Sequence, residues 1–147
     1  MDRKPDFDAI RIGDALPQVS LEITQELINE YAVLSGDFNP IHVDLEAAAK
    51  SEFKGTIAHG TIPVEPMIQS ICRWLGRPWC PEGTEMHLRF RAPSRPGDSI
   101  RNVAKIVDKK VEHGRRTVTV EFSCLNQHDH PVINGTWIVI VPDDQGP

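Results

Sequence analysis

An acidic side chain and an imidazole lie five positions apart, at Asp37 and His42, in a segment that cannot continue as helix. Gly36 ends a helical pattern before them, and Pro40 pushes Asn39 towards an extended conformation. Such a kinked segment can bring both side chains to one side. A carboxylate and a neutral imidazole around one water molecule can polarise it and move its proton, which is general acid–base chemistry near neutral pH. The Asn39 amide could fix the loop or the water.

A second pair of residues, His59 and Gly60, comes directly before a predicted helix. A glycine there lets a ligand approach the backbone closely, and its N–H lies near the positive end of the helix dipole. That donor can stabilise the oxyanion that a thioester carbonyl becomes when its enolate forms. Asp37, His42 and Gly60 would then supply the water activator and the enolate stabiliser that hydration of an α,β-unsaturated thioester requires. For His59, the sequence favours a buried residue that holds the loop by hydrogen bonds over a proton-transfer group.

The first element that must position these groups is a helix that begins after Thr24 and ends at Gly36. Thr24 can cap its amino end, and apolar residues follow at i, i+3, i+4 and i+7 spacing. Its predicted apolar face consists of Leu27, Ile28, Tyr31, Ala32 and Leu34. Tyr31 is therefore expected in the core, although its hydroxyl could reach the site.

Two further helices are predicted downstream. Asp44 can cap a short, alanine-rich helix over residues 45–51, which explains Asp44 without a catalytic role. A third helix is expected over residues 64–75, with Pro63 and Pro66 confined to its first turn.

The second half of the chain changes to an alternation of period two, which is typical of strands with one buried face. The alternating apolar residues are Met86, Leu88, Phe90, Ala92, Val118, Val120, Phe122 and Cys124. Gly114 and residues 126–130 mark turns, and residues 135–141 predict a central or interface strand. An entry strand is expected over residues 7–16. The predicted fold class is α+β: one domain over residues 1–147, with an antiparallel sheet of about five strands wrapped around the third helix.

Composition excludes several classes of function. The 147 residues carry a formal net charge of −5, which argues against a nucleic-acid partner because phosphate binding needs a positive surface. No stretch approaches the roughly 20 apolar residues that span a bilayer, and the N-terminus lacks the apolar core of a signal peptide. Cys72, Cys80 and Cys124 lie far apart in the sequence without metal-ligand spacing, which favours reduced, packed thiols in a cytoplasmic protein.

These motifs resemble those of the MaoC-like, (R)-specific enoyl-CoA hydratases and related acyl-carrier dehydratase subunits. The matching stretches are Tyr31-Ala32, Ser35-Gly36-Asp37-x-Asn39-Pro40-Ile41-His42-x-Asp44, Ala48, Phe53 and Ile57-Ala58-His59-Gly60, with weaker matches at Arg89-Phe90-Arg91-Ala92-Pro93 and Arg95-Pro96-Gly97-Asp98. The resemblance covers nearly the whole chain. One departure follows Gly60, where relatives usually have small or unbranched apolar residues and this chain has two prolines and Glu65. This departure leaves the shape of the acyl pocket, and with it the substrate, open.

The resemblance implies a single hot-dog fold in which Asp37 and His42 are the catalytic dyad and the Gly60 N–H is the oxyanion-hole donor. The supporting residues would be Asn39, His59 and Tyr31. Water would add syn to an enoyl thioester of coenzyme A or an acyl carrier protein and give an (R)-3-hydroxyacyl thioester, as in fatty acid metabolism. Because the chain has the length of one hot-dog unit and not of two, the resemblance implies a homodimer. No cofactor, metal, nucleic-acid partner or membrane partner is expected.

Other interpretations of the same residues stay open. A hot-dog thioesterase would use the same fold and release free thiol, and a non-catalytic acyl-binding subunit of a heteromeric dehydratase would normally lack the dyad. His42, Asp44 and His59 have the residue types of a two-histidine, one-carboxylate metal site, although Asp44 is needed as a cap. His128 and His130 form a second pair, at a turn.

Three arginines on the weaker matching stretch, Arg89, Arg91 and Arg95, could receive coenzyme A phosphates, since a guanidinium suits phosphate geometry. A solvated strand face is the favoured interpretation of all three. Trp74 and Trp79 could line an acyl channel or a dimer contact.

Overall fold

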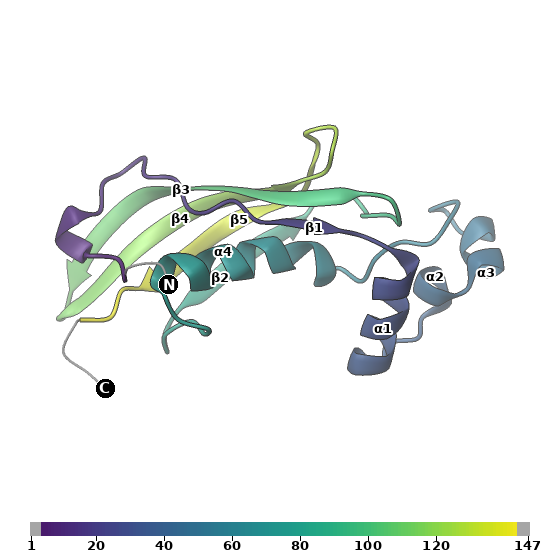
Figure 1. The fold of residues 1–147 in the computed structure, drawn as a ribbon, viewed down its shortest axis with the longest axis horizontal. Helices are drawn as coiled ribbons and strands as arrows, with labels where there is room; N and C mark the ends of the chain where they lie inside the picture. Colours follow the sequence, from purple (N-terminus) through teal and green to yellow (C-terminus); the bar gives the residue numbers. More distant parts are fainter. Residues whose placement is uncertain (1–3, 144–147) are drawn as a thin grey trace.

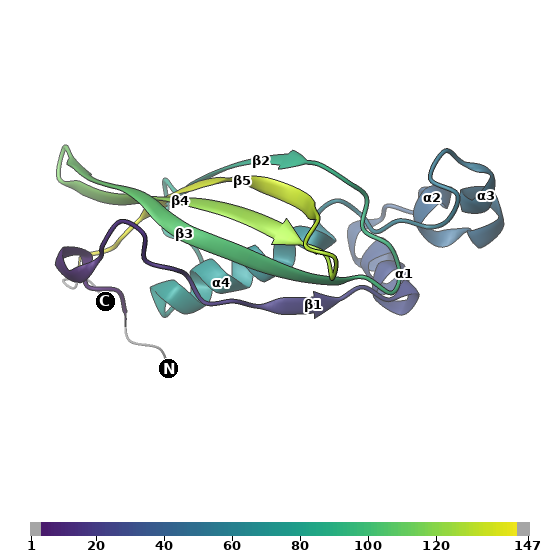
Figure 2. The ribbon, with the colours of Figure 1, turned by 90° about the horizontal axis from the view of Figure 1, so that it is seen from above.

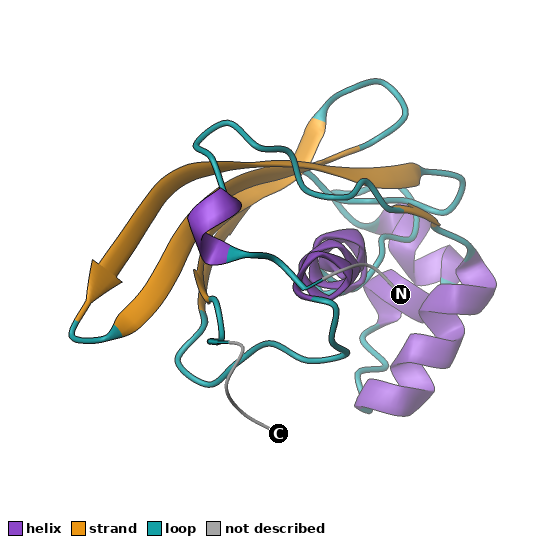
Figure 3. Ribbon diagram, turned by 60° about the vertical axis from the view of Figure 1, so that its left-hand side comes forward, coloured by secondary structure: helices purple, strands orange, loops and turns teal. Residues whose placement is uncertain are grey.

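A five-stranded antiparallel sheet curls around one long helix in the computed structural model, which describes residues 4–143 (Figure 1). The strands are β1 (Ser20–Glu22), β2 (Glu85–Phe90), β3 (Ser99–Glu112), β4 (Arg115–Leu125) and β5 (Pro131–Ile140), in the order β1-β3-β4-β5-β2. The helices are α1 (Gln25–Ser35), α2 (Pro40–Val43), α3 (Leu45–Lys50) and α4 (Glu65–Leu75), with 3-10 turns η1 (Phe7–Ala9) and η2 (Ile62–Val64). Viewed along its axis, α4 lies inside the curl of the sheet (Figure 3). The expected α+β class is confirmed.

The central strands follow the predicted alternation. On β4 the four inward residues are at most 2% exposed, and they are Val118, Val120, Phe122 and Cys124. The β3–β4 hairpin turns at His113 and Gly114, whose φ angles of 51° and 75° are both left-handed, as a two-residue type I′ turn requires. Strand β5 pairs with β4 and β2, so the strand predicted at residues 135–141 is a central one.

Strand β2 is an edge strand, and its burial was predicted wrongly. Figure 2 shows β2 and β1 at the two edges of the sheet. Met86 and Phe90 lie on the face of β2 expected to be buried, yet they are 39% and 62% exposed. An alternating pattern specifies which residues share a face, but an edge strand has a neighbour on one side only.

The pairing of β2 with β5 depends on Gly135. Leu88 pairs with Gly135, and a Cβ added to Gly135 would lie 2.0 Å from the carbonyl oxygen of His87. Because that atom belongs to the backbone, it cannot move aside without breaking the pairing. At Gly135 the two backbones therefore lie closer together than a residue with a Cβ atom would allow.

Helix α4 forms the inner layer almost where the sequence predicts it. Pro63 lies in η2 and Pro66 in the first turn of α4, where a missing N–H costs no intrahelical hydrogen bond. Its residues Met67, Ile71 and Leu75 are at most 2% exposed and pack in the core.

Helices α1, α2 and α3 lie beyond one end of the sheet (Figures 1 and 2). Thr24 caps α1 by accepting a hydrogen bond from the Leu27 N–H, and Gly36 ends it with a φ of 75°, both as predicted. Asp44 caps α3, also as predicted. Leu34, expected on the buried face of α1, is 83% exposed.

The entry strand predicted over residues 7–16 is wrong. This segment contains η1 and a single bridge from Ala15 to Lys105, and the first strand starts at Ser20. Asp6 accepts a hydrogen bond from the Asp8 N–H, and Asp14 accepts one from the Arg11 N–H. Such local bonds between side chains and backbone compete with a strand ladder.

All three cysteines are free thiols. Burial raises the pKa of Cys80 to about 11, and the neighbouring Cys72 thiol adds to this effect. Burial raises the pKa of Cys124 to about 12. Both thiols are therefore protonated at neutral pH and are poor nucleophiles. Among residues 4–143, no helix has the length and apolar character that crossing a bilayer requires.

Candidate active site

Asp37, His42 and Gly60 line one cavity of about 410 Å³ at the end of the sheet that faces α1 and α2. The complete lining is Tyr31, Ser35, Asp37, His42, His59, Gly60, Thr61 and Phe90. Five of the six residues proposed from the sequence therefore meet around one space. The exception is Asn39.

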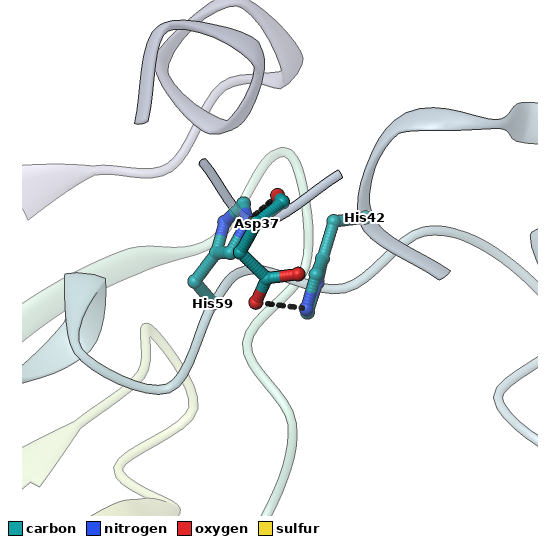
Figure 4. A group of neighbouring side chains, drawn as sticks. All are labelled: Asp37, His42 and His59. Atoms are coloured by element: carbon teal, nitrogen blue, oxygen red, sulfur yellow. Dashed lines mark hydrogen bonds and ion pairs between the residues drawn. The ribbon is translucent and has the colours of Figure 1, made fainter. Parts of the chain in front are cut away.

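The side chains of Asp37 and His42 face each other (Figure 4). Their nearest atoms, Asp37 Oδ2 and His42 Nε2, are 3.9 Å apart. The other ring nitrogen, Nδ1, donates to the Ile57 carbonyl oxygen at 2.8 Å, so it carries the proton in a neutral ring. Nε2 then presents a lone pair towards a carboxylate. Two acceptors cannot hydrogen-bond to each other, and a separation of 3.9 Å leaves room for a donor that both share.

Local hydrogen bonds hold the acidic residue in this orientation. The Asp37 N–H donates to Ser35 Oγ at 3.2 Å, and Asp37 Oδ1 accepts from the Asn39 N–H at 3.1 Å. Asp37 Oδ2 is thereby left for the cavity. The carboxylate is half exposed, whereas the His42 side chain is 10% exposed.

Asn39 has a structural position in the loop. Its φ of −52° and ψ of 128° are extended, as Pro40 predicts, and its side chain accepts from the Ile41 N–H. It thereby caps α2, a single helical turn that begins at Pro40. As predicted, the preceding helix does not continue through Pro40, since α1 ends at Ser35. The short helix that begins at Pro40 was not predicted, although proline is favoured in the first helical position. This turn presents His42 to the cavity.

His59 lies against both members of the pair. Its Nε2 donates to the Asp37 carbonyl oxygen at 2.9 Å, and its ring stacks on that of His42 with centroids 3.9 Å apart (Figure 4). The side chain is 4% exposed, and its Nδ1 has no hydrogen-bond partner among the described residues. The sequence prediction of a buried histidine that holds the loop agrees with this geometry.

Gly60 presents a free main-chain donor. Its N–H donates to no residue within 4–143, and the glycine is exposed at the cavity. A Cβ at this position would lie 2.9 Å from Cε1 of Phe90, so glycine makes room for that ring. The 3-10 turn η2 separates Gly60 from α4.

Gln25 is a positioning residue that sequence reasoning missed. Its Nε2 donates to the His42 carbonyl oxygen at 2.8 Å, and its Oε1 accepts from Thr56 Oγ1 at 2.7 Å. One amide thus ties the start of α1 to the segment that carries His42 and to the segment that leads to Gly60. These contacts span 17 and 31 residues, so no local pattern marks Gln25.

Tyr31 lines the outer part of the cavity. Its phenol oxygen accepts a hydrogen bond from Thr61 Oγ1 at 2.6 Å, and its ring lies 4.8 Å from that of His59. The Tyr31 hydroxyl proton can therefore point to a ligand.

A carboxylate and two imidazoles, from Asp37, His42 and His59, place ligand atoms within 4.8 Å of one another and could hold a divalent ion. Asp44, the carboxylate of the set that the sequence offered on paper, caps α3 as the sequence predicted. Two of the four ring nitrogens already donate to carbonyl groups. Only His42 Nε2 and the buried His59 Nδ1 are left as nitrogen ligands.

Comparison with known proteins decides the family. Residues 9–127 match the family model described as a MaoC like domain. The chain belongs to the MaoC-like family. It is 28% identical over 137 residues to the mitochondrial 3-hydroxyacyl-[acyl-carrier-protein] dehydratase of Arabidopsis thaliana, covering 91% of this chain and 79% of that protein. It is 30% identical over 121 residues to the 3-hydroxybutyryl-CoA dehydratase of Methylorubrum extorquens, covering 82% and 74% respectively.

Solved structures agree with this assignment. The unliganded R-hydratase PhaJ1 of Pseudomonas aeruginosa superposes with a TM-score of 0.78 at 26% identity, covering 94% of this chain and 86% of that chain. The hot-dog fold expected from the sequence is thus confirmed. The MaoC-like relatives named here are hydratases and dehydratases, which supports an enzyme of this kind.

Proposed function

We propose that this chain interconverts an enoyl thioester and its (R)-3-hydroxyacyl thioester, with Asp37 and His42 as the acid–base pair. The observation that carries the proposal is the 3.9 Å separation of His42 Nε2 and Asp37 Oδ2 in a cavity that also contains the free N–H of Gly60. The dehydratases and the hydratase among its relatives support the reaction type.

The two acceptors suit one water molecule. A water between them donates one O–H to His42 Nε2 and the other to the Asp37 carboxylate. Its oxygen lone pairs then point away from both groups, into the cavity. Both protein groups pull on the water protons, so the oxygen becomes a better nucleophile.

Hydration then proceeds in balanced steps. The water oxygen bonds to C3 of the enoyl group while the π bond between C2 and C3 breaks, and one water proton passes to the pair. Electron density moves to the thioester oxygen, and an enolate forms. The enolate oxygen accepts a hydrogen bond from the Gly60 N–H. The pair returns its proton to C2, and the carbonyl forms again. Because one pair supplies both oxygen and proton, both add to the same face, which is syn addition.

We also propose that residues 1–147 act as one cytoplasmic domain that forms a homodimer. Support for the dimer comes from apolar side chains at the surface. Met86 and Phe90, on the same face of the edge strand β2, are 39% and 62% exposed. Exposed apolar residues in one region are typical of protein–protein contacts.

The test of the reaction is a pair of isosteric substitutions, Asp37→Asn and His42→Gln. Each removes one acid–base partner, so each should lower the turnover number for crotonyl-CoA hydration at least ~100-fold. Loss of enoyl absorbance gives the rate, and chiral analysis of the product gives its configuration. Asp44→Asn, which keeps an α3 cap, is the matched control and should stay within a few-fold of wild type.

The same assay separates the alternatives. A thioesterase would release free thiol, which a thiol reagent detects, without hydration of the double bond. A metal-dependent enzyme would lose activity in a chelator, whereas acid–base catalysis by the pair should continue in EDTA. Retention of near wild-type hydration by Asp37→Asn or His42→Gln would rule out the proposed mechanism.

A further inference from the structure

A second cavity, of about 290 Å³, adjoins the one that contains the acid–base pair. The two cavities share His42, Gly60 and Phe90. A thioester that reacts beside His42 and Gly60 has two arms, its acyl group and its thiol-bearing group. The two cavities are therefore candidate spaces for the two arms, with the reacting carbons where they meet.

The charges along the two cavities differ. The first is lined by Asp37 and by no lysine or arginine, whereas the second is lined by Arg91. Arg91 also borders a third hollow, of about 270 Å³, together with Arg89 and His87. A positively charged path therefore leads out of the second cavity and not out of the first.

The arginines on this path have no carboxylate partners. Within residues 4–143, ion pairs involve Arg101 and Arg116 but neither Arg89 nor Arg91, in a chain of net charge −5. Arg91 Nε donates to Asn134 Oδ1 at 3.0 Å, which fixes the guanidinium and leaves both terminal NH₂ groups unpaired with described residues. A fixed guanidinium with free NH₂ groups suits a phosphate.

The wall of the second cavity suits an arm that alternates apolar groups with amides. Phe53, Ile57 and Pro63 line it, and so does Ser94. The Ser94 hydroxyl is buried and has no hydrogen-bond partner among the described residues. A buried hydroxyl needs an acceptor, and an amide carbonyl of a bound arm would provide one.

We infer that the pantetheine arm of the substrate lies in this second cavity, that its phosphate contacts Arg91 and Arg89, and that the acyl group lies beside Tyr31 and Thr61 in the first. The inference rests on the proposed function. It follows from charge, because the pantetheine arm ends in a phosphate both in coenzyme A and on a carrier protein, whereas a simple acyl group carries none. The opposite placement would bring the phosphate towards Asp37.

The test compares three substrates with the same reacting group: crotonyl-CoA, crotonyl-phosphopantetheine and crotonyl-pantetheine. The variants Arg91→Gln and Arg89→Gln remove the charges, and their double variant removes both. Loss of a charge-assisted contact should raise the KM for crotonyl-CoA about tenfold and leave kcat within about twofold. The KM for crotonyl-pantetheine should not change. Arg91→Lys, which keeps the charge, should recover much of the loss.

The phosphopantetheine substrate identifies which phosphate is bound. An effect equal to that on crotonyl-CoA places the phosphate shared with carrier proteins at the arginines, as inferred. An effect on crotonyl-CoA alone would place the nucleotide phosphates there and overturn that contact. Arg11→Gln, an exposed arginine outside all three hollows, is the control. Circular dichroism checks that each variant is folded.

Equal changes in KM for all three substrates, or none for crotonyl-CoA, would overturn the inference. If Asp37→Asn abolishes hydration while the arginine variants behave like wild type, the arrangement of the arms is wrong and the proposed function stands. Calorimetric binding of coenzyme A to wild type and variants tests the arginines without turnover. Equal affinity for wild type and the double variant would also reject them as the phosphate site.

Discussion

At the scale of single residues, the site depends on which ring nitrogens carry protons. Carbonyl oxygens accept from His42 Nδ1 and from His59 Nε2, and they fix the tautomer of each neutral ring. His42 Nε2 is consequently an acceptor, as water activation requires. The rings of His42 and His59 stack with their centroids 3.9 Å apart, so each ring packs against a face of the other. His59 therefore helps to orient both Asp37, through its carbonyl oxygen, and the ring of His42.

Substitution of His59 tests this positioning role. His59→Gln keeps a donor for the Asp37 carbonyl, whereas His59→Leu leaves that carbonyl without one. We expect His59→Leu to lower kcat about tenfold and to lose about 1 kcal/mol of unfolding free energy, and His59→Gln to retain most of both. The KM for crotonyl-CoA gives a separate readout, which should stay within about twofold because His59 positions the pair and is not proposed to bind the substrate. Full activity in His59→Leu would contradict the positioning role.

Cys124 gives a prediction about pH and stability. Its pKa is raised from 9.0 to about 12 in the folded state, so the folded state resists ionisation that the unfolded chain undergoes. Stability contributed by the neutral thiol is present below pH 9 and is lost as pH rises above it. Relative to Cys124→Ala, the wild type should lose about 1 kcal/mol of unfolding free energy between pH 9 and pH 10. Urea denaturation at both values measures this, and equal pH dependence would contradict it.

At the scale of elements, the sequence predicted the features that depend on residues close together in the chain. The Thr24 cap, the Gly36 stop and the Asp44 cap set the ends of α1 and α3, and each involves neighbours within a few residues. The alternation on β4 predicted its buried face for the same reason. Gln25 and the edge position of β2 could not be predicted, because they depend on partners distant in sequence. The 3-10 turn in place of the entry strand follows from aspartate side chains that bind nearby N–H groups.

The site also combines features that nearby residues predict with features that depend on distant segments. Motif residues Asp37, His42 and Gly60 could be selected from the sequence, because their types and spacing define the chemistry. Their separation could not, because it is set by the Ile57 carbonyl and by Gln25, which belong to other segments.

The β2–β5 pair provides a test at this scale. Gly135→Ala would place a Cβ 2.0 Å from the His87 carbonyl oxygen, so β2 must separate from β5. We expect a loss of at least about 2 kcal/mol of unfolding free energy in urea. Gly55→Ala is the matched control, since its Cβ would meet only the end of Arg95 at 3.6 Å, and it should change stability by less than about 0.5 kcal/mol. Equal stability of both variants would show that β2 adapts.

At the scale of the whole molecule, exposed apolar groups and an open sheet edge occur together. Strand β2 has a partner on one side only, and Met86 and Phe90 project from it with 39% and 62% exposure. An unprotected edge of this kind invites pairing with another strand. A second copy of the chain would cover it and would bring new residues close to Phe90 at the cavity.

The molecular mass in solution tests the predicted homodimer. Light scattering after size exclusion should give about 33 kDa, twice the 16.5 kDa of one chain. Met86→Lys places a charge on the edge strand and should shift the mass towards that of a single chain. A wild-type mass of one chain at micromolar concentration would contradict the dimer.

The proposed acid–base residues and the proposed oxyanion donor all come from one stretch, Asp37 to Gly60, that lies between α1 and α4. The main apolar core, in contrast, is built from α4 and the long strands. Laboratory evolution could therefore alter the two parts with some independence: replacements in the short stretch would change which molecules are processed, and replacements in the strands would change heat tolerance. Residues 37–60 could therefore be changed to alter the reaction while α4 and the long strands continue to stabilise the fold.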